Sequence, residues 1–209
     1  MNIISTKKSP STEKNVKALL LLIFSVLATA LSHCTDDGDG IAPNTPAYFL
    51  QESEKLSIPT EVAIPNAEDA RVATYYAKGV QIYNAQVIEG SDPVAYQWVF
   101  ASPSANLYNE RNELVGSHFA GPSWQLNGGD KINGQQFTPA KTKNVDAGSV
   151  DWLLLKPKTG SISTGIFSNV EYIQRIATIG GKAPATPPAS ASETTGVPYT
   201  AVYRFSKAN

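Results

Sequence analysis

The sequence predicts an all-β fold: a single β-sandwich or barrel-like domain of about eight strands with long loops. Three observations carry this prediction. From residue 72 onward, short apolar-rich runs alternate with turn signals, which is typical of strands. The 15 glycines and 14 prolines are spread along the chain, and aromatic residues greatly outnumber the single methionine, which favours strands and turns over long helices. The length of 209 residues suits one sizeable domain with appendages.

Five runs of alternating or apolar residues predict strands in the first half of this domain. The turn clusters between them include residues 89–93, Gly121-Pro122 and residues 127–130, where Asn-Gly supplies the positive φ values of a tight hairpin turn. The last of the five runs is polar and is expected at a sheet edge. The five expected strands are residues 80–84, 94–100, 114–120, 123–127 and 132–138.

The second half of the domain is expected to supply the strands that complete the sheet. Residues 150–155 form a nearly continuous apolar run, which predicts a strand buried on both faces. Residues 166–179 predict one bent strand or two successive strands. Residues 197–205 place alternate apolar side chains on one face and predict a final strand that seals the sheet. The segments 141–149 and 183–196 are predicted loops.

The N-terminal segment has the features of a signal peptide, predicted over residues 1–33. Residues 1–34 carry a net charge of +3, since four lysines oppose one glutamate. The apolar run 18–31 would extend roughly 21 Å as a helix, which is shorter than the ~30 Å hydrocarbon core of a bilayer. A positive segment followed by an apolar run of this length indicates export rather than a membrane span.

Leu31-Ser32-His33-Cys34 resembles the lipobox of bacterial lipoproteins, in which the cysteine thiol receives lipid; His33 departs from the small residue of that pattern. The alternative is ordinary signal-peptidase cleavage after Ala30, which leaves a free thiol in a secreted protein. Lipidation of Cys34 gives this lone cysteine a physical role, with the lipid bilayer as its partner through an acyl anchor. We therefore expect a cell-envelope protein, an outer-membrane lipoprotein on the periplasmic or surface face, with a secreted protein as the alternative.

Residues 34–69 are predicted to be the lipid-anchor cysteine and a flexible tether. The acidic stretch 35–40 lacks the spacing of a calcium loop and is interpreted as a solvated spacer. Prolines interrupt residues 41–69, which predicts an extended arm with one edge strand near residues 62–64. The folded domain is expected over residues 70–209.

Charge and composition exclude several classes of function. After the leader, 13 of the 17 basic and 17 of the 18 acidic side chains remain, and the resulting net charge of −4 argues against nucleic acid as a partner. The single cysteine allows no intrachain disulfide and no cysteine-based zinc site. His118 is the only histidine after the leader, so we expect no histidine-rich metal site, and no motif predicts a cofactor.

Seven short sequence blocks follow one another in the predicted domain. They are residues 79–83 (GVQIY), 98–101 (WVFA), 116–124 (GSHFAGPSW), 152–155 (WLLL), 173–176 (IQRI), 180–184 (GGKAP) and 197–201 (VPYTA). Together they resemble the family known as domain of unknown function 3455, over about residues 70–205. The resemblance implies no established activity. It implies that relatives carry cysteines at the positions of Ala85 and a residue near Pro188, and a disulfide between them would place these two segments close together.

His118 is the candidate for proton transfer, because imidazole titrates near neutral pH. A nearby carboxylate, from Asp151 or Glu171, would complete a hydrolase-type catalytic group with it. The alternative interpretation is a hydrogen-bonded structural histidine beside the Gly121-Pro122 corner. No Gly-x-Ser-x-Gly motif accompanies His118, so catalysis is the alternative function and a non-catalytic domain is the leading one.

Trp98, Trp124, Arg175 and His118 are the candidate ligand-binding residues. Aromatic rings line sugar and lipid grooves, but they also fill the cores of β-domains. Arg175 suits an anionic ligand, or a cross-strand pairing with Asp151 or Glu171. The leading hypothesis is an exported lipoprotein whose β-domain binds a small molecule, a glycan or a protein partner; the sequence predicts no oligomeric state.

Overall fold

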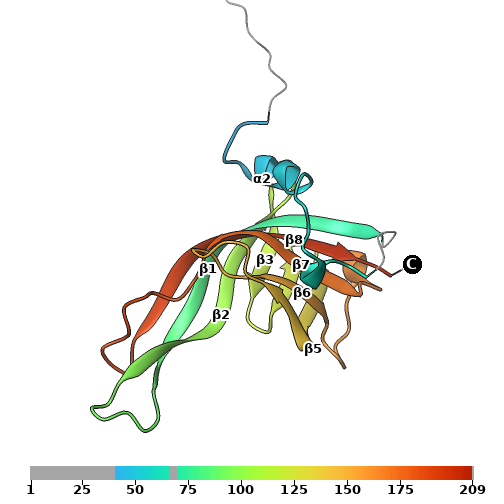
Figure 1. Ribbon diagram of the computed structural model, residues 1–209. Helices are drawn as coiled ribbons and strands as arrows, with labels where there is room; N and C mark the ends of the chain where they lie inside the picture. The colour runs from blue at the N-terminus through green and yellow to red at the C-terminus, as the bar shows by residue number, and fades with distance from the viewer. Residues whose placement is uncertain (1–40, 66–69, 209) are drawn as a thin grey trace, which may run out of the picture. The chain divides into compact units, whose positions relative to one another are not determined.

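In the computed structural model, which describes residues 41–65 and 70–208, eight antiparallel strands form a closed ring (Figure 1). The strands pair in chain order, and the last pairs with the first. This confirms the predicted all-β fold. The strands are β1 (Arg71–Val87), β2 (Tyr96–Tyr108), β3 (Leu114–Phe119), β4 (Ser123–Leu126), β5 (Lys131–Lys143), β6 (Trp152–Pro157), β7 (Tyr172–Gly180) and β8 (Thr194–Ser206).

The leader, the lipobox and Cys34 lie outside the described residues. The described residues also include one α-helix and two short 3₁₀ helices, which are α2 (Pro46–Ser53), η1 (Thr60–Val62) and η2 (Gly165–Phe167). Within these same residues, no helix is both long and apolar enough to cross a bilayer.

The predicted hairpins and the sealing strand are present. Tyr83 pairs with Phe100 across β1 and β2, and the amide of Leu126 donates to the carbonyl of Asp130 at 2.8 Å in the β4–β5 turn. The strand β8 pairs with β7 on one side and β1 on the other, so that Tyr203 lies between Arg175 and Tyr75. Closure by the last strand is therefore confirmed.

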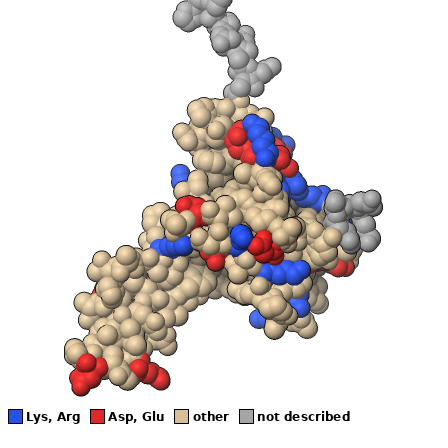
Figure 2. Space-filling model, in the orientation of Figure 1, with Lys and Arg blue, Asp and Glu red and all other residues tan. Residues whose placement is uncertain are grey.

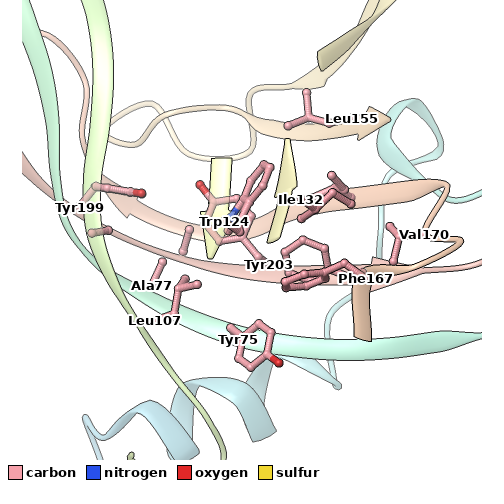
Figure 3. Packing of buried hydrophobic residues seen from close by; sticks show 14 residues of the cluster. Tyr75, Ala77, Leu107, Trp124, Ile132, Leu155, Phe167, Val170, Tyr199 and Tyr203 are labelled. Atoms are coloured by element: carbon pink, nitrogen blue, oxygen red, sulfur yellow. The ribbon is translucent and has the colours of Figure 1, made fainter. Parts of the chain in front are cut away.

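Alternation along the strands divides the apolar side chains between the interior and exterior of the ring. On β8, Tyr199, Ala201, Tyr203 and Phe205 belong to the interior cluster. Figure 3 shows Trp124, Tyr203 and Ile132 meeting in that interior. The remaining buried members of the cluster are Tyr75, Ala77, Ala105, Leu107, Leu155, Phe167, Val170 and Ile173.

A second cluster lies on the outer face, beneath α2 and η1. Leu50 of α2 and Val62 of η1 pack there with Leu154 and Trp152 of β6. On the other face of β6, Leu155 belongs to the interior cluster. The prediction that this strand is buried on both faces is therefore confirmed.

The expectation of an extended arm with an edge strand near residues 62–64 is wrong for the described part of that segment. Thr45 caps α2 by accepting a hydrogen bond from the amide of Tyr48 at 3.3 Å. Pro46 begins the helix, where its missing N–H carries no penalty, so this proline starts a regular element instead of breaking one. Val62 is fully buried in η1.

Arg204 holds the end of α2 on the ring. Its side chain is 5% exposed, and Nη2 donates to the carbonyl of Ser53 at 2.7 Å. Nη2 also lies 3.3 Å from the carboxylate of Glu54, which pairs with Arg71 of β1 at 2.5 Å. The segment before β1 is thus joined to the ring by polar contacts as well as apolar packing.

Two other element predictions need correction. The strand β5 runs to Lys143, beyond the predicted 132–138, and it pairs with β4 and β6, so it is not a sheet edge. The β5–β6 register shifts between Gln136 and Lys141, and such an irregularity interrupts the alternation of side chains. The alternation pattern therefore does not show that the strand continues to Lys143. The predicted strand over 166–179 is η2 followed by β7, which begins only at Tyr172.

Candidate functional site

An entrance to the interior of the closed ring lies where β2 runs past the end of β3. Residues 96–108 of β2 pair with β1, but only residues 105–108 pair with β3, and the long β1–β2 hairpin extends beyond the ring (Figure 1). A cavity of about 390 Å³ lies at this opening. Its buried lining includes His118, Trp124 and Tyr203, and Phe100 from β2 is half exposed at its edge.

Both ring nitrogens of His118, which is 2% exposed, are engaged by neighbours. A carbonyl can only accept, so Nδ1 carries the proton and donates to the Ser123 carbonyl at 2.8 Å. Nε2 therefore accepts from the Tyr203 hydroxyl at 3.0 Å. The imidazole stacks on the Trp124 indole, with ring centroids 4.5 Å apart and planes 9° from parallel.

Burial lowers the pKa of His118 to about 3, because the enclosed site disfavours the imidazolium. The Ser123 hydrogen bond opposes this shift, and the charge of Arg175 reinforces it. The neutral ring has its one lone pair occupied by Tyr203. This arrangement fits the structural interpretation of His118, since no basic nitrogen is free to take a proton from a substrate.

The structure does not bring the two candidate carboxylates to His118. The Asp151 carboxylate accepts hydrogen bonds from Asn144 at 2.8 Å and Thr142 at 3.2 Å. Glu171 is exposed just before β7, where its amide donates to the Ser206 carbonyl. The described residues thus contain no hydrogen-bonded pair of His118 with either acid.

The two candidate tryptophans lie in different places. Trp124 is fully buried and lines the cavity, whereas Trp98 lies on the extended hairpin and donates Nε1 to the Thr186 carbonyl at 2.9 Å. Trp98 also pairs with Ala85 on β1, whose amide donates to the Glu193 carbonyl at 2.8 Å. The segments around residue 85 and residues 186–193 are therefore close in space, as the family resemblance implies.

Arg175 projects from β7 into the ring and lines the cavity beside Tyr203. Its Nε and Nη2 donate to the backbone carbonyl of Asp151 at 3.1 and 2.7 Å. The cross-strand contact expected with Asp151 thus exists, but it uses the backbone instead of the carboxylate. A second hollow of about 430 Å³ adjoins the first, because Arg175, Gln81 and Phe100 line both.

Two buried donors at the cavity have no hydrogen-bond partner among the described residues. Gln81 is 1% exposed and Trp124 fully buried, and neither Gln81 Nε2 nor Trp124 Nε1 is satisfied. The Gln81 amide neighbours the Tyr199 hydroxyl, but that hydroxyl is also without a partner of acceptable geometry. Sequence reasoning missed Gln81, although the alternation placed this polar side chain on the same strand face as Tyr83.

The family comparison covers the whole ring. Residues 65–207 match the family described as "Protein of unknown function (DUF3455)". The chain belongs to this family. The DUF3455 match includes all eight strands and every residue that lines the two hollows, and its description assigns no activity. No curated protein and no solved structure matches the chain.

Proposed function

We propose that this protein is a non-catalytic, lipid-anchored binding protein of the cell envelope that holds a small, largely apolar molecule inside its strand ring. The observation that carries the proposal is the cavity of about 390 Å³, lined by buried aromatic side chains and by two buried donors without partners. Eight-stranded rings are wide enough to hold one small ligand. The cavity volume lies within the range of small-molecule sites.

Binding is better supported than catalysis. A catalytic base needs a free lone pair within reach of its substrate, and the lone pair of His118 is used by Tyr203. A buried donor without a partner instead favours a ligand that supplies an acceptor, because an unsatisfied polar group is costly to bury. Gln81 of β1 and Trp124 of β4 are two such donors in the cavity lining.

The binding proposal is tested with the neutral apolar dye N-phenyl-1-naphthylamine, which fluoresces in apolar surroundings. The wild-type protein is expected to bind the dye. Ala101, exposed on β2 at the cavity, is a position where a larger side chain obstructs the opening. We expect Ala101→Trp to weaken dye binding by about tenfold or more. Ala191→Trp, in an exposed loop outside the cavity lining, is the matched control and should bind normally. Equal dye binding by both variants would contradict the proposal.

The anchor part of the proposal rests on the lipobox-like residues and the lone cysteine. In a bacterial host fed radiolabelled palmitate, we expect the wild-type protein to be labelled and to sediment with membranes. Cys34→Ser should remove the label and release the protein from the membrane fraction, because one thiol carries the acyl chains. Unchanged membrane association of Cys34→Ser would overturn lipid anchoring.

A further inference from the structure

We propose that the ligand of this cavity is an amphipathic carboxylate, whose carboxylate group is held by Arg175 together with the donors of Gln81 and Trp124. This inference rests on the proposed binding function and names the chemical class of its ligand. The cavity of about 390 Å³ is called the inner hollow, and the adjoining one of about 430 Å³ the outer hollow. The polar end of the ligand is assigned to the lining that the two hollows share, where Arg175 and Gln81 both lie.

Arg175 carries a positive charge that no carboxylate neutralises. Among residues 41–65 and 70–208, the ion pairs do not include Arg175; its guanidinium donates to the Asp151 backbone carbonyl and also interacts with the Tyr203 hydroxyl. The two bonds to Asp151 and the interaction with Tyr203 engage at most three of the five N–H donors of a guanidinium, so at least two remain. A planar guanidinium presents such donors in a fork that matches a carboxylate.

The other ionisable groups of the two hollows leave an anion the favoured guest. Lys182 adds a second positive charge in the outer hollow, and Asp151 adds one negative charge there. The Asp151 carboxylate faces Asn144 and Thr142, which satisfy it by hydrogen bonds. In the inner hollow, Arg175 is the one charged side chain of the described lining, since His118 is neutral.

Two buried donors share the lining of the inner hollow with the guanidinium. Gln81 Nε2 and Trp124 Nε1 lack partners, and both side chains are at least nine-tenths buried. A carboxylate has two oxygens with about four lone-pair sites, enough to accept from several donors at once. One oxyanion can therefore satisfy polar groups that the protein leaves unpaired.

The remainder of the inner lining suits an apolar body. Phe100, Pro103, Leu153 and Leu155 contribute apolar surface to it. Outside the cavity, the face visible in Figure 2 shows acidic and basic side chains intermixed, so no one-sign basic patch on that face competes for anions. The selectivity for an anionic guest thus comes from the interior.

The test compares two molecules that share an apolar body and differ in charge. The wild-type protein is loaded with N-phenyl-1-naphthylamine, and the dye is displaced by 2-naphthoate or by the neutral 2-naphthylmethanol. We expect 2-naphthoate to bind at least about tenfold more tightly than 2-naphthylmethanol, because only the carboxylate forms charge-assisted hydrogen bonds with the guanidinium. Arg175→Gln should reduce that preference, measured as the ratio of the two affinities within the same variant, to within about twofold.

Two further variants keep the test decisive. Gln81→Met removes a donor that has no protein partner, so the fold should tolerate it, and it should weaken 2-naphthoate more than the alcohol. If Arg175→Gln unfolds below the assay temperature, the change in carboxylate preference caused by Gln81→Met tests the assignment instead. Arg111→Gln is the matched control, because Arg111 is exposed and paired with Glu113 at 2.9 Å away from the cavity lining. It should preserve the preference.

Each result separates this inference from the binding proposal. Equal affinities for 2-naphthoate and 2-naphthylmethanol in the wild type would overturn the carboxylate assignment and leave cavity binding intact. A preference that survives both Arg175→Gln and Gln81→Met would overturn the assigned residues. Absence of binding of the dye and of both naphthyl compounds would overturn the binding function and this inference together.

Discussion

Replacing Trp124 by alanine is expected to lower the free energy of unfolding by about 3–5 kcal/mol, because a fully buried indole leaves a large cavity. The ring of Trp124 contacts three aromatic neighbours: it stacks on His118, and it meets Tyr203 and Phe205 edge-on at centroid distances of 5.2 and 5.6 Å. Removing it takes away the centre of the interior cluster. Equilibrium unfolding in urea at neutral pH measures the loss.

Trp98→Ala is the matched control. Trp98 is only partly buried on the extended hairpin, where it makes one side-chain hydrogen bond to Thr186, so its loss should be well below that of Trp124→Ala. Trp124→Phe keeps most of the ring contacts and removes an N–H that has no partner, so it should cost less than half as much as alanine. Equal losses for Trp124→Ala and Trp98→Ala would contradict the central role of the Trp124 ring.

The strands could be predicted from the sequence because alternation is a local signal. The run that became β8 shows it most clearly, since every second side chain from Tyr199 to Phe205 faces the interior. The sealing role of the last strand could be predicted, but the register in which β8 meets β1 and β7 could not, because it depends on contacts between strands far apart in the sequence. The helix α2 was missed because an isolated proline is equally consistent with a break and with a helix start. Packing of Leu50 against the outer face of the ring selects the helix.

The chemistry of the site could be predicted only in part. The sequence pointed to His118, Trp124 and Arg175, because imidazole, indole and guanidinium groups commonly bind protons or ligands. The structure places all three in the lining of one cavity. Their partners are determined by strand register: Tyr203 lies opposite Arg175 on β7 and reaches His118 across the interior. Gln81 carries no motif, so its buried, unpaired amide becomes visible only when the neighbouring strands are in place.

The stability of the protein is expected to fall as the pH falls from 6.5 toward 3, with His118 as the group responsible for the first part of the loss. The unfolded histidine titrates near 6.5, whereas burial lowers the pKa of His118 in the folded protein to about 3. Between these values the unfolded chain binds a proton that the folded chain does not. The free energy of unfolding therefore rises with pH in this window, and the contribution of His118 is fully present above about pH 6.5.

The size of the effect follows from the linkage slope of about 1.36 kcal/mol per pH unit for one proton. Between pH 7 and pH 5, the wild-type protein should lose about 2 kcal/mol of unfolding free energy through His118. Carboxylates with lowered pKa values, such as those of Glu54 and Asp146, add to the loss only at more acidic pH, because their ordinary values are 4.5 and 3.8.

His118→Gln isolates the contribution of the buried imidazole, because glutamine offers an amide donor and acceptor but does not titrate. Its unfolding free energy, measured in urea between pH 7 and pH 5, should be nearly flat where that of the wild type declines. The other histidine of the chain, His33, is present in both proteins and cancels in the comparison. Parallel curves for the two proteins would show that His118 is not held neutral by burial, and that the hydrogen bond from Tyr203 does not depend on a neutral ring.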